Sequence, residues 1–387
     1  MRLTTLLILC SLLGFTQLKA QSSDSLQYAA EKHFKNVRQL TFGGDNAEAY
    51  WSYDGKYIIF QRTNPKEGLN CDQIFIGKVP QSPDEPFTYR LVSTGKGRTT
   101  CAYFLPDGKH IIYASTHEGS NDCPPVPDRN KYGNRYIWPL YNTYDIYMAD
   151  TSGKIVKKLT TAKGYDAEAT LSPDGKKMIY CSDKDGDLEL YVMDLKTGKE
   201  KRITTSLGYD GGAWFSPDSK KIVWRASRPK TAEAIKEYQD LLKDGMVAPT
   251  NMEVWVANAD GSNAKQITEL GQANWAPNFT PDSKRIIFCS NHEYKRGFPF
   301  NMYMVDLEGK VQRLQQALAA PVKVEPIPAS AEASATRLQE PTTNDDSERQ
   351  IRLFALGRID GAATGLAAAA CFFFVGASTG SLLALSV

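Results

Sequence analysis

The chain has 387 residues, of which 42% are hydrophobic and 23% are charged. This is the composition of a globular protein and excludes a wholly disordered or fibrous chain. Because 46 basic residues balance 44 acidic ones, the formal net charge is only +2, which argues against nucleic acid as a partner.

The first twenty residues have the pattern of a secretory signal peptide. Arg2 precedes an apolar run, and the segment ends at Ala20. We therefore expect a mature chain that starts at Gln21 and is exported to the periplasm or cell envelope. A lipoprotein signal would use Cys10, but Leu9 is bulky where a small residue is usual, so this alternative is disfavoured.

Six cysteines remain after this cleavage, and export would allow them to form disulfides. Their spacing fits no zinc site. Cys181 and Cys289 lie in apolar strand patterns, where free thiols act as small hydrophobic side chains. In the repeat scheme below, a bridge is expected only among Cys71, Cys101 and Cys123.

A short motif recurs five times along the chain, as in "WSYDGKYIIF", "FLPDGKHIIY" and "LSPDGKKMIY". Its aspartates are separated by 53, 67, 44 and 64 residues, and the shortest step approximates the bare repeat. A unit of about 40 to 45 residues with several short strands predicts a β-propeller blade. The five aspartates are Asp54, Asp107, Asp174, Asp218 and Asp282.

The clearest unit divides at its Gly- and Asp-rich turns into four strands. We expect strand a at residues 169–171, strand b at 177–182, strand c at 188–195 and strand d at 200–204. The motif itself is then the turn between strands a and b, not a repeated active site.

In that turn, Pro173 presets the backbone, Asp174 can accept backbone N–H bonds, and Gly175 tolerates the left-handed conformation. Two copies carry Ser219 or Ser283 in place of the glycine, which weakens the turn without abolishing it.

These turns, the strand d pattern "RQLT", "KKLT", "KRIT" and "KQIT", and the loops "GYDAEA" and "GYDGGA" resemble the TolB-like, WD-repeat-like propellers of exported bacterial proteins. The resemblance covers residues 30–314 and implies an exported scaffold. It does not identify a partner, because propellers carry many activities.

The strand "RQLT" at residues 38–41 precedes any strand a, so it should complete the last blade of a closed ring. A sixth turn is expected near residue 325, where the sequence has none. We expect an all-β chain: a β-propeller of four-stranded antiparallel blades, with five complete repeats of a six-bladed ring and the last blade missing or replaced.

The predicted domains are a signal peptide at 1–20, the propeller at 21–314, a disordered Ala/Pro/Glu/Ser-rich linker at 315–358 and a hydrophobic segment at 359–387. The last 27 residues are uncharged and long enough to span a bilayer. Three explanations of this C-terminal region stay open: a membrane anchor, a gene fusion, or an end altered by a frameshift or assembly error. The altered end is favoured, because an unpaired first strand would expose sheet edges.

All long insertions fall between strands b and c, which places them on one face of the ring, and elaboration of one face suggests a binding surface. The insertion of the fourth repeat predicts a helix from Thr231 that stops at Gly245. In the second repeat's insertion, Trp138 and Tyr141 are available to stack on a ligand, or else form a small core of the loop.

The loops from strand d to strand a lead to the axial channel and bring several carboxylates to one opening. This cluster could bind a cation or a basic peptide end. The competing interpretation is that these acids cap turns and bond backbone N–H groups between blades. The candidates are Asp45, Glu48, Arg98, Asp166, Glu168, Asp210, Asn274 and Trp275.

His117 and His292 follow strand b at matching positions of the second and fifth repeats, and each precedes a glutamate. Because those blades are not neighbours, a shared metal site is disfavoured. No cofactor is expected, although a divalent cation in the channel is left open.

The sequence thus favours a non-enzymatic exported propeller that binds a protein or peptide partner, with cell-envelope material as one option, through its loop-rich face and axial channel. Membrane contact is expected only if the C-terminal segment is genuine. The alternative is a metal-assisted lyase or hydrolase in the channel, or a propeller that accompanies a peptidase.

Overall fold

The computed structural model describes residues 37–82, 84–133, 135–294, 300–314 and 383–385. The predicted signal peptide, the linker and all but three residues of the hydrophobic C-terminal segment lie outside these ranges. Within the described residues, no helix has the length and apolar character needed to cross a membrane.

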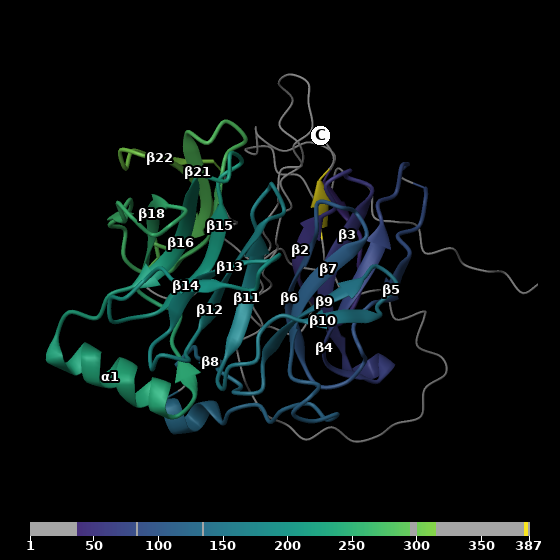
Figure 1. Cartoon of the computed structure of the whole chain (residues 1–387), viewed down its shortest axis with the longest axis horizontal. Helices are drawn as coiled ribbons and strands as arrows, with labels where there is room; N and C mark the ends of the chain where they lie inside the picture. The colour runs from purple at the N-terminus through teal and green to yellow at the C-terminus, as the bar shows by residue number, and fades with distance from the viewer. Residues whose placement is uncertain (1–36, 83, 134, 295–299, 315–382, 386–387) are drawn as a thin grey trace, which may run out of the picture.

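Five four-stranded antiparallel sheets form the blades (Figure 1). Blade 1 consists of β2 (Asp45–Trp51), β3 (Tyr57–Asn64), β4 (Leu69–Lys78) and β5 (Tyr89–Leu91). Blade 2 consists of β6 (Thr99–Phe104), β7 (His110–Ser115), β9 (Asp145–Asp150) and β10 (Ile155–Lys158). Blade 3 consists of β11 (Asp166–Leu171), β12 (Lys177–Ser182), β13 (Glu189–Asp194) and β14 (Glu200–Arg202).

The same order repeats in the last two blades. Blade 4 consists of β15 (Asp210–Phe215), β16 (Lys221–Ser227), β18 (Met252–Asn258) and β19 (Lys265–Gln266). Blade 5 consists of β20 (Asn274–Phe279), β21 (Arg285–Ser290), β22 (Asn301–Asp306) and β23 (Val311–Arg313). The predicted five repeats are confirmed, and the predicted strands of blade 3 agree with the observed ones to within three residues. The sixth position of the ring stays a prediction.

In all five turns between strands a and b the aspartate carboxylate accepts from the backbone N–H two residues later, and in every copy except that of blade 2 it also accepts from a Ser or Thr hydroxyl two residues earlier. In blade 3 the Asp174 carboxylate accepts from the N–H of Lys176 at 3.1 Å and from the Ser172 hydroxyl at 2.6 Å. The residue after the aspartate has a positive φ in every copy, including Ser219 (60°) and Ser283 (58°). The predicted role of the motif as a turn is therefore confirmed, and we call the side that carries it the turn face.

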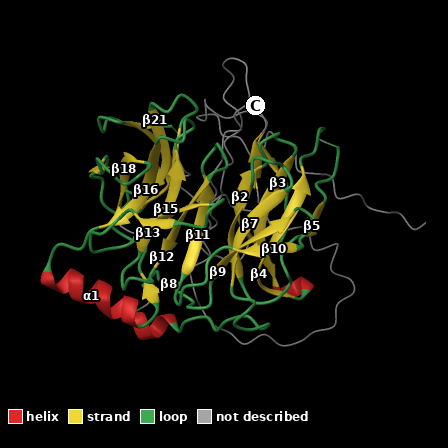
Figure 2. Ribbon diagram, viewed as in Figure 1, coloured by secondary structure: helices red, strands yellow, loops and turns green. Residues whose placement is uncertain are grey.

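The long insertions lie on the opposite side, here called the loop-rich face. Figure 2 shows the helical segments in red at this end of the strands. They are α1 (Ala232–Lys243), η2 (Pro65–Glu67) and η3 (Arg129–Tyr132). The predicted helix is confirmed: the Thr231 hydroxyl accepts from the N–H of Ala234 at 3.2 Å, and α1 buries Tyr238 and Leu241.

Two insertions join into one unit. The short strands β8 (Trp138–Pro139) from blade 2 and β17 (Met246–Val247) from blade 4 pair antiparallel. A separate small core of Tyr132, Ile137 and Leu241 holds them together. We call residues 116–144 and 228–251 together the platform; it bridges two blades that are not neighbours.

Consecutive blades pack face to face and share one hydrophobic core. The strand a of each of blades 2 to 5 contacts the strands of the preceding blade. Contacts of this extent are not found between blade 5 and blade 1 within the described residues, and the two blades stand apart on the left and right of Figure 1.

The first strand, β1 (Val37–Gln39), pairs antiparallel with β24 (Leu383–Leu385) in a two-stranded sheet. Its partner therefore comes from the far end of the chain, but the sheet has only these two strands among the described residues, so closure of the ring by a last blade stays a prediction. This pairing corrects the premise, used above for an altered C-terminus, that the first strand is left unpaired.

Candidate functional site

A cavity of about 380 Å³ lies on the axis of the blades, and residues from all five blades line it. Every strand a has a break in its register, at Ala47/Tyr50 in blade 1 and at equivalent places in the others. The residue at the break has a left-handed φ between 48° and 58°. These five bulge residues all line the cavity, and they are Glu48, Cys101, Glu168, Gly212 and Ala276.

The bulges are the reason that these side chains reach the axis. An extra residue in one strand redirects its side chain away from the ordinary alternation. Four of the five are not glycine, although left-handed backbone is unfavourable for other residues and tends to occur at binding or catalytic sites. The inner strands are thus strained at the level of the cavity.

Glu168 is at the centre of a buried network. Its carboxylate accepts from Arg225 Nη2 at 2.9 Å and from the Gly212 N–H at 2.7 Å, and also from the Tyr209 hydroxyl. Burial lowers the pKa of Arg225, but Glu168, Tyr209 and Glu48 together outweigh burial and the pKa rises. Gly212 is required here, since a Cβ would lie 1.6 Å from Arg225 Nη1.

Glu48 occupies the same position in blade 1 as Glu168 does in blade 3, but it forms no ion pair with an arginine within the described residues. Its carboxylate accepts a hydrogen bond from the Tyr50 hydroxyl. Burial raises the pKa of Glu48 to about 7; the Tyr50 hydrogen bond and the charge of Arg225 oppose this, and Glu168 adds to it. The carboxyl is therefore close to half protonated at neutral pH.

A second charged group lies at the cavity edge between blades 1 and 2. Arg98 forms an ion pair with Asp72, whose other oxygen accepts from the Thr63 hydroxyl at 2.6 Å. Asp45 lines the same part of the cavity. Asp72 was missed from the sequence because it lies inside strand c, where polar residues usually face solvent.

Four of the predicted channel residues, Asp166, Asp210, Asn274 and Trp275, do not line the cavity. Asp166, Asp210 and Asn274 begin their strands and contact the preceding blade instead: the Asp210 N–H donates to Leu188 O at 2.9 Å, and Asn274 Nδ2 donates to Met252 O at 2.8 Å. These contacts join neighbouring blades through a backbone N–H and a side-chain amide, whereas the Asp210 carboxylate accepts within its own blade, from Trp224 Nε1 at 2.6 Å.

Burial raises the pKa of Asp210 to about 7, and that of Asp166 to about 6. For Asp210, the neighbouring Arg228 opposes the shift with a hydrogen bond of 2.7 Å. Among the described residues, three carboxyls have a pKa raised to about 6 or 7: Asp166 and Asp210 lie between blades, and Glu48 lines the cavity.

The platform supplies the aromatic wall of the cavity at the loop-rich end. Trp138 and Tyr141 both line it, and Trp138 lies with its ring 5.5 Å from the Arg225 guanidinium. Trp275 is buried beneath, with its ring 5.7 Å from that of Trp138 and its Nε1 donating to Pro249 O. The aromatics of the Trp138 loop therefore pack together and also face the cavity, and their stacking on a ligand stays a prediction.

His117 and His292 do not line the cavity, and the two share the same ring and serine contacts. Each ring stands against a tyrosine of strand c, Tyr147 or Tyr303, and each Nδ1 is 2.9 Å from a serine hydroxyl. Burial lowers the pKa of both histidines. No group of three metal-ligating side chains is found in the part of the chain that the structure describes.

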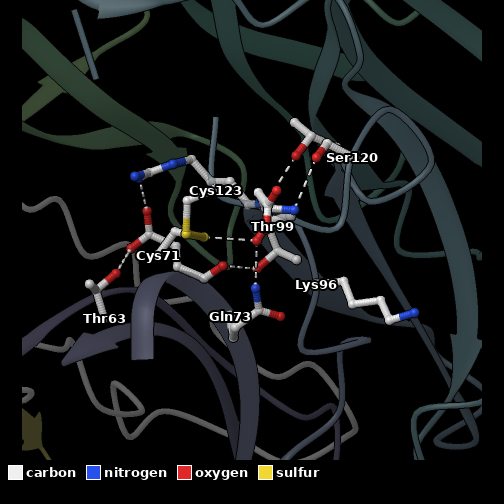
Figure 3. The surroundings of a disulfide bond; sticks show 12 residues. Thr63, Cys71, Gln73, Lys96, Thr99, Ser120 and Cys123 are labelled. Carbon is white, nitrogen blue, oxygen red and sulfur yellow. Dashed lines mark hydrogen bonds and ion pairs between the residues drawn. A yellow bond between two sulfur atoms is a disulfide. The ribbon is translucent and has the colours of Figure 1, made fainter. Parts of the chain in front are cut away.

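A disulfide fixes the platform to blade 1. Cys71 in β4 is bonded to Cys123 in the blade 2 insertion, with 5.9 Å between the Cα atoms. Figure 3 shows hydrogen bonds around it, among them Gln73 Nε2 to Gly97 O at 2.8 Å and the Thr99 hydroxyl to Asp72 O at 2.9 Å. The bridge is one of the pairings that the sequence left open.

The cavity residues that the sequence analysis did not single out fall into two groups, of which only one has a signal in the sequence. Arg225 and Tyr209 belong to the same blade as Gly212, but no motif or spacing in the sequence relates them to Glu168. The bulge residues do carry a weak signal, because all five precede an alanine or a proline: the pairs are "EA", "CA", "EA", "GA" and "AP".

Comparison with known proteins agrees with this architecture. Residues 139–244 match the TolB beta propeller domain. The chain is 27% identical over 271 residues to the "Uncharacterized protein Atu1656" of Agrobacterium fabrum, covering 67% of this chain and 72% of that protein.

Among solved structures, one assigned to TolB from Agrobacterium tumefaciens matches with a TM-score of 0.50 and 20% identity, over 70% of this chain and 81% of the other. TolB from Acinetobacter baumannii matches with a TM-score of 0.49 and 18% identity, over 69% and 53%. A puromycin-hydrolyzing peptidase of Mycobacterium tuberculosis matches at 0.43 and 15%, over 73% of this chain and 38% of the peptidase.

The five blades and the repeated turns show that the chain folds as a β-propeller, and residues 139–244 within it match the TolB beta propeller domain.

Proposed function

We propose that this propeller is exported and binds a protein or peptide partner through its loop-rich face and axial cavity. The observation that carries the proposal is the contrast between the two faces. The turn face repeats one short turn five times, whereas the loop-rich face carries a folded platform that covers the cavity. Insertions positioned by a rigid scaffold are a common way to build a binding surface.

Exposed apolar side chains also support the loop-rich face as the binding surface. Phe42, Val126 and Leu207 are 61%, 73% and 37% exposed, and all three lie in loops of the loop-rich face. Isolated exposed apolar residues are ordinary, but these accompany the aromatic wall of the cavity. Together they provide the apolar contacts that protein partners usually need.

A pull-down from cell-envelope extract tests the proposal. Val126→Asp and Leu207→Asp place charge on the loop-rich face at exposed positions, so neither should unfold the protein. Val156→Asp is the matched control, because Val156 is 47% exposed on the outer strand β10. We expect a protein captured by the wild type and by the control to be lost from both loop-rich variants.

If all four proteins capture the same set, the loop-rich face is not the binding surface and the proposal fails. Thermal melting of each variant confirms that a lost partner reflects the surface and not unfolding.

A further inference from the structure

The axial cavity is aromatic at both ends. At its turn-face end Tyr50, Tyr103 and Trp214 pack around one another, with ring centroids 5.1 to 5.6 Å apart. At the loop-rich end it is lined by Tyr136, Trp138 and Tyr141 of the platform. Its volume is near the lower end of the range for small-ligand pockets, so it suits one chain end or side chain better than a long segment.

Negative charge exceeds positive charge among the cavity-lining residues. Four carboxylates face two guanidinium groups. Arg98 is paired with Asp72, and Arg225 with Glu168. Of the other two carboxylates, Asp45 is exposed at the edge, whereas Glu48 lies inside, and no ion pair to Glu48 is found within the described ranges.

The surroundings of Glu48 favour a cation over other ligands. Aromatic ring faces attract ammonium groups, and the attraction grows as water is excluded. An anion would meet the excess of carboxylates, and the described residues offer no three-ligand group for a metal. An uncharged ligand would leave the Glu48 carboxyl in its unfavourable buried state.

We propose that the axial cavity binds an ammonium group of the partner, either an amino terminus or a lysine side chain, at the Glu48 carboxylate among the rings of Tyr50, Tyr103 and Trp214. This inference rests on the proposed function and specifies what the partner inserts. Glu168 and Arg225 then act as a fixed pair that keeps the neighbouring position neutral.

The pH dependence follows from the groups that face Glu48. These are Tyr50 on its own strand, Cys101 in blade 2, Glu168 in blade 3 and Arg225 in blade 4. Burial holds the pKa of the Cys101 thiol well above its ordinary value, so this thiol stays neutral. A proton on Glu48 competes with the ammonium group, and affinity should fall as pH drops below about 7, by up to tenfold per unit.

Titration calorimetry with three tripeptide amides tests the inference on the full chain at pH 7.5. Triglycine amide carries only an α-ammonium, acetyl-Gly-Lys-Gly amide carries only a lysine ammonium, and acetyl-Gly-norleucine-Gly amide carries neither. We expect one or both ammonium peptides to bind at least tenfold more tightly than the neutral one, and the stronger of the two identifies the source.

Glu48→Gln keeps the shape and an acceptor for Tyr50 but removes the charge, so it should weaken ammonium binding at least tenfold and abolish its dependence on pH. Glu269→Gln is the matched control, because Glu269 is exposed and does not line the cavity. It should bind as the wild type does.

Equal binding of the charged and neutral peptides, or unchanged binding by Glu48→Gln, would overturn the inference. The pull-down separates this failure from that of the proposed function. A partner lost from the Val126 and Leu207 variants without any ammonium binding overturns the cavity inference alone, whereas Glu48-dependent ammonium binding without such a partner overturns the proposed function alone.

Discussion

The two faces of the propeller are held together by different kinds of interaction. On the turn face, each aspartate bonds groups within five residues of itself, so each turn is complete in its own blade. On the loop-rich face, the bonds join residues far apart: Cys71 with Cys123, and Lys131 with Asp244 at 2.9 Å. The Tyr238 hydroxyl of α1 likewise donates to Asp187 of blade 3.

This difference explains why one face is regular and the other is not. A turn that satisfies its own backbone can be repeated without change in every blade. A platform that spans non-neighbouring blades needs partners that occur once, and so it breaks the repeat. The cavity lies between the two, where a repeated bulge presents a different side chain in each blade.

The largest expected effect comes from the pair at the cavity. Arg225→Met leaves the Glu168 carboxylate, whose side chain is 9% exposed, without its positive partner. We expect a loss of about 3–5 kcal/mol in the free energy of unfolding, measured by urea denaturation. Arg285→Ala, at an exposed position of the turn face, should cost less than about 0.5 kcal/mol.

The double variant Arg225→Met with Glu168→Gln removes both charges and should recover part of the lost stability. No recovery would mean that Arg225 acts through its packing against Trp138 and not through its charge.

Loss of the disulfide should come next in size. For a loop of 52 residues the chain-entropy model gives about 4 kcal/mol, and the Cys71→Ser, Cys123→Ser variant should lose about 2–4 kcal/mol. Trypsin should then cleave the freed insertion at Lys131, while the turn face stays protected. Reductant should lower the stability of the wild type and allow the same cleavage, and it should leave the variant unchanged. A wild type that reductant does not affect would contradict this prediction.

Replacing Glu48 should have a smaller effect, and it should increase the free energy of unfolding instead of decreasing it. Its folded pKa is about 7 and its ordinary value is 4.5, so between these values the folded state holds a proton that the unfolded state has released. Stability from this group therefore falls as pH rises from about 4.5 to 7. Because the side chain faces an accessible cavity, Glu48→Gln should be more stable than the wild type by about 1–3 kcal/mol at pH 8.

At pH 4 the two proteins should be equally stable, since Glu48 is then protonated in both states. Thermal melts across this range check the prediction, and a constant difference would contradict it. Greater stability combined with lost ammonium binding is the expected signature of a residue kept for binding.

The smallest effects should come from the turns. Asp218→Ala removes acceptors for Ser216 Oγ and the Lys220 N–H, at 2.6 and 3.1 Å, and should cost about 1 kcal/mol. Asp174→Ala removes the same contacts in blade 3 and should cost the same within about 0.5 kcal/mol, measured by urea denaturation. A large difference would show that the turns are not independent.

Much of the fold was predictable because each blade is formed by residues that are close together in the sequence. The strands, the turn at Asp174, the cap at Thr231 and the side that carries the insertions all follow from patterns within about 45 residues. The candidate site was predictable only in part. Glu48, Glu168 and Trp138 line the cavity, whereas Asp210 and Asn274 bond neighbouring blades.

What the linear sequence determined by itself is the repeat: five four-stranded units, their left-handed turns, and a loop-rich face opposite to them. It could do so because each of these features depends on residues that are close in the chain. Only the tertiary structure decided which of the two bulge glutamates forms an ion pair with an arginine. Arg225 is 57 residues from Glu168 and reaches it from β16 because blades 3 and 4 pack against each other. Glu48, at the same position of its own repeat, forms no ion pair within the described residues.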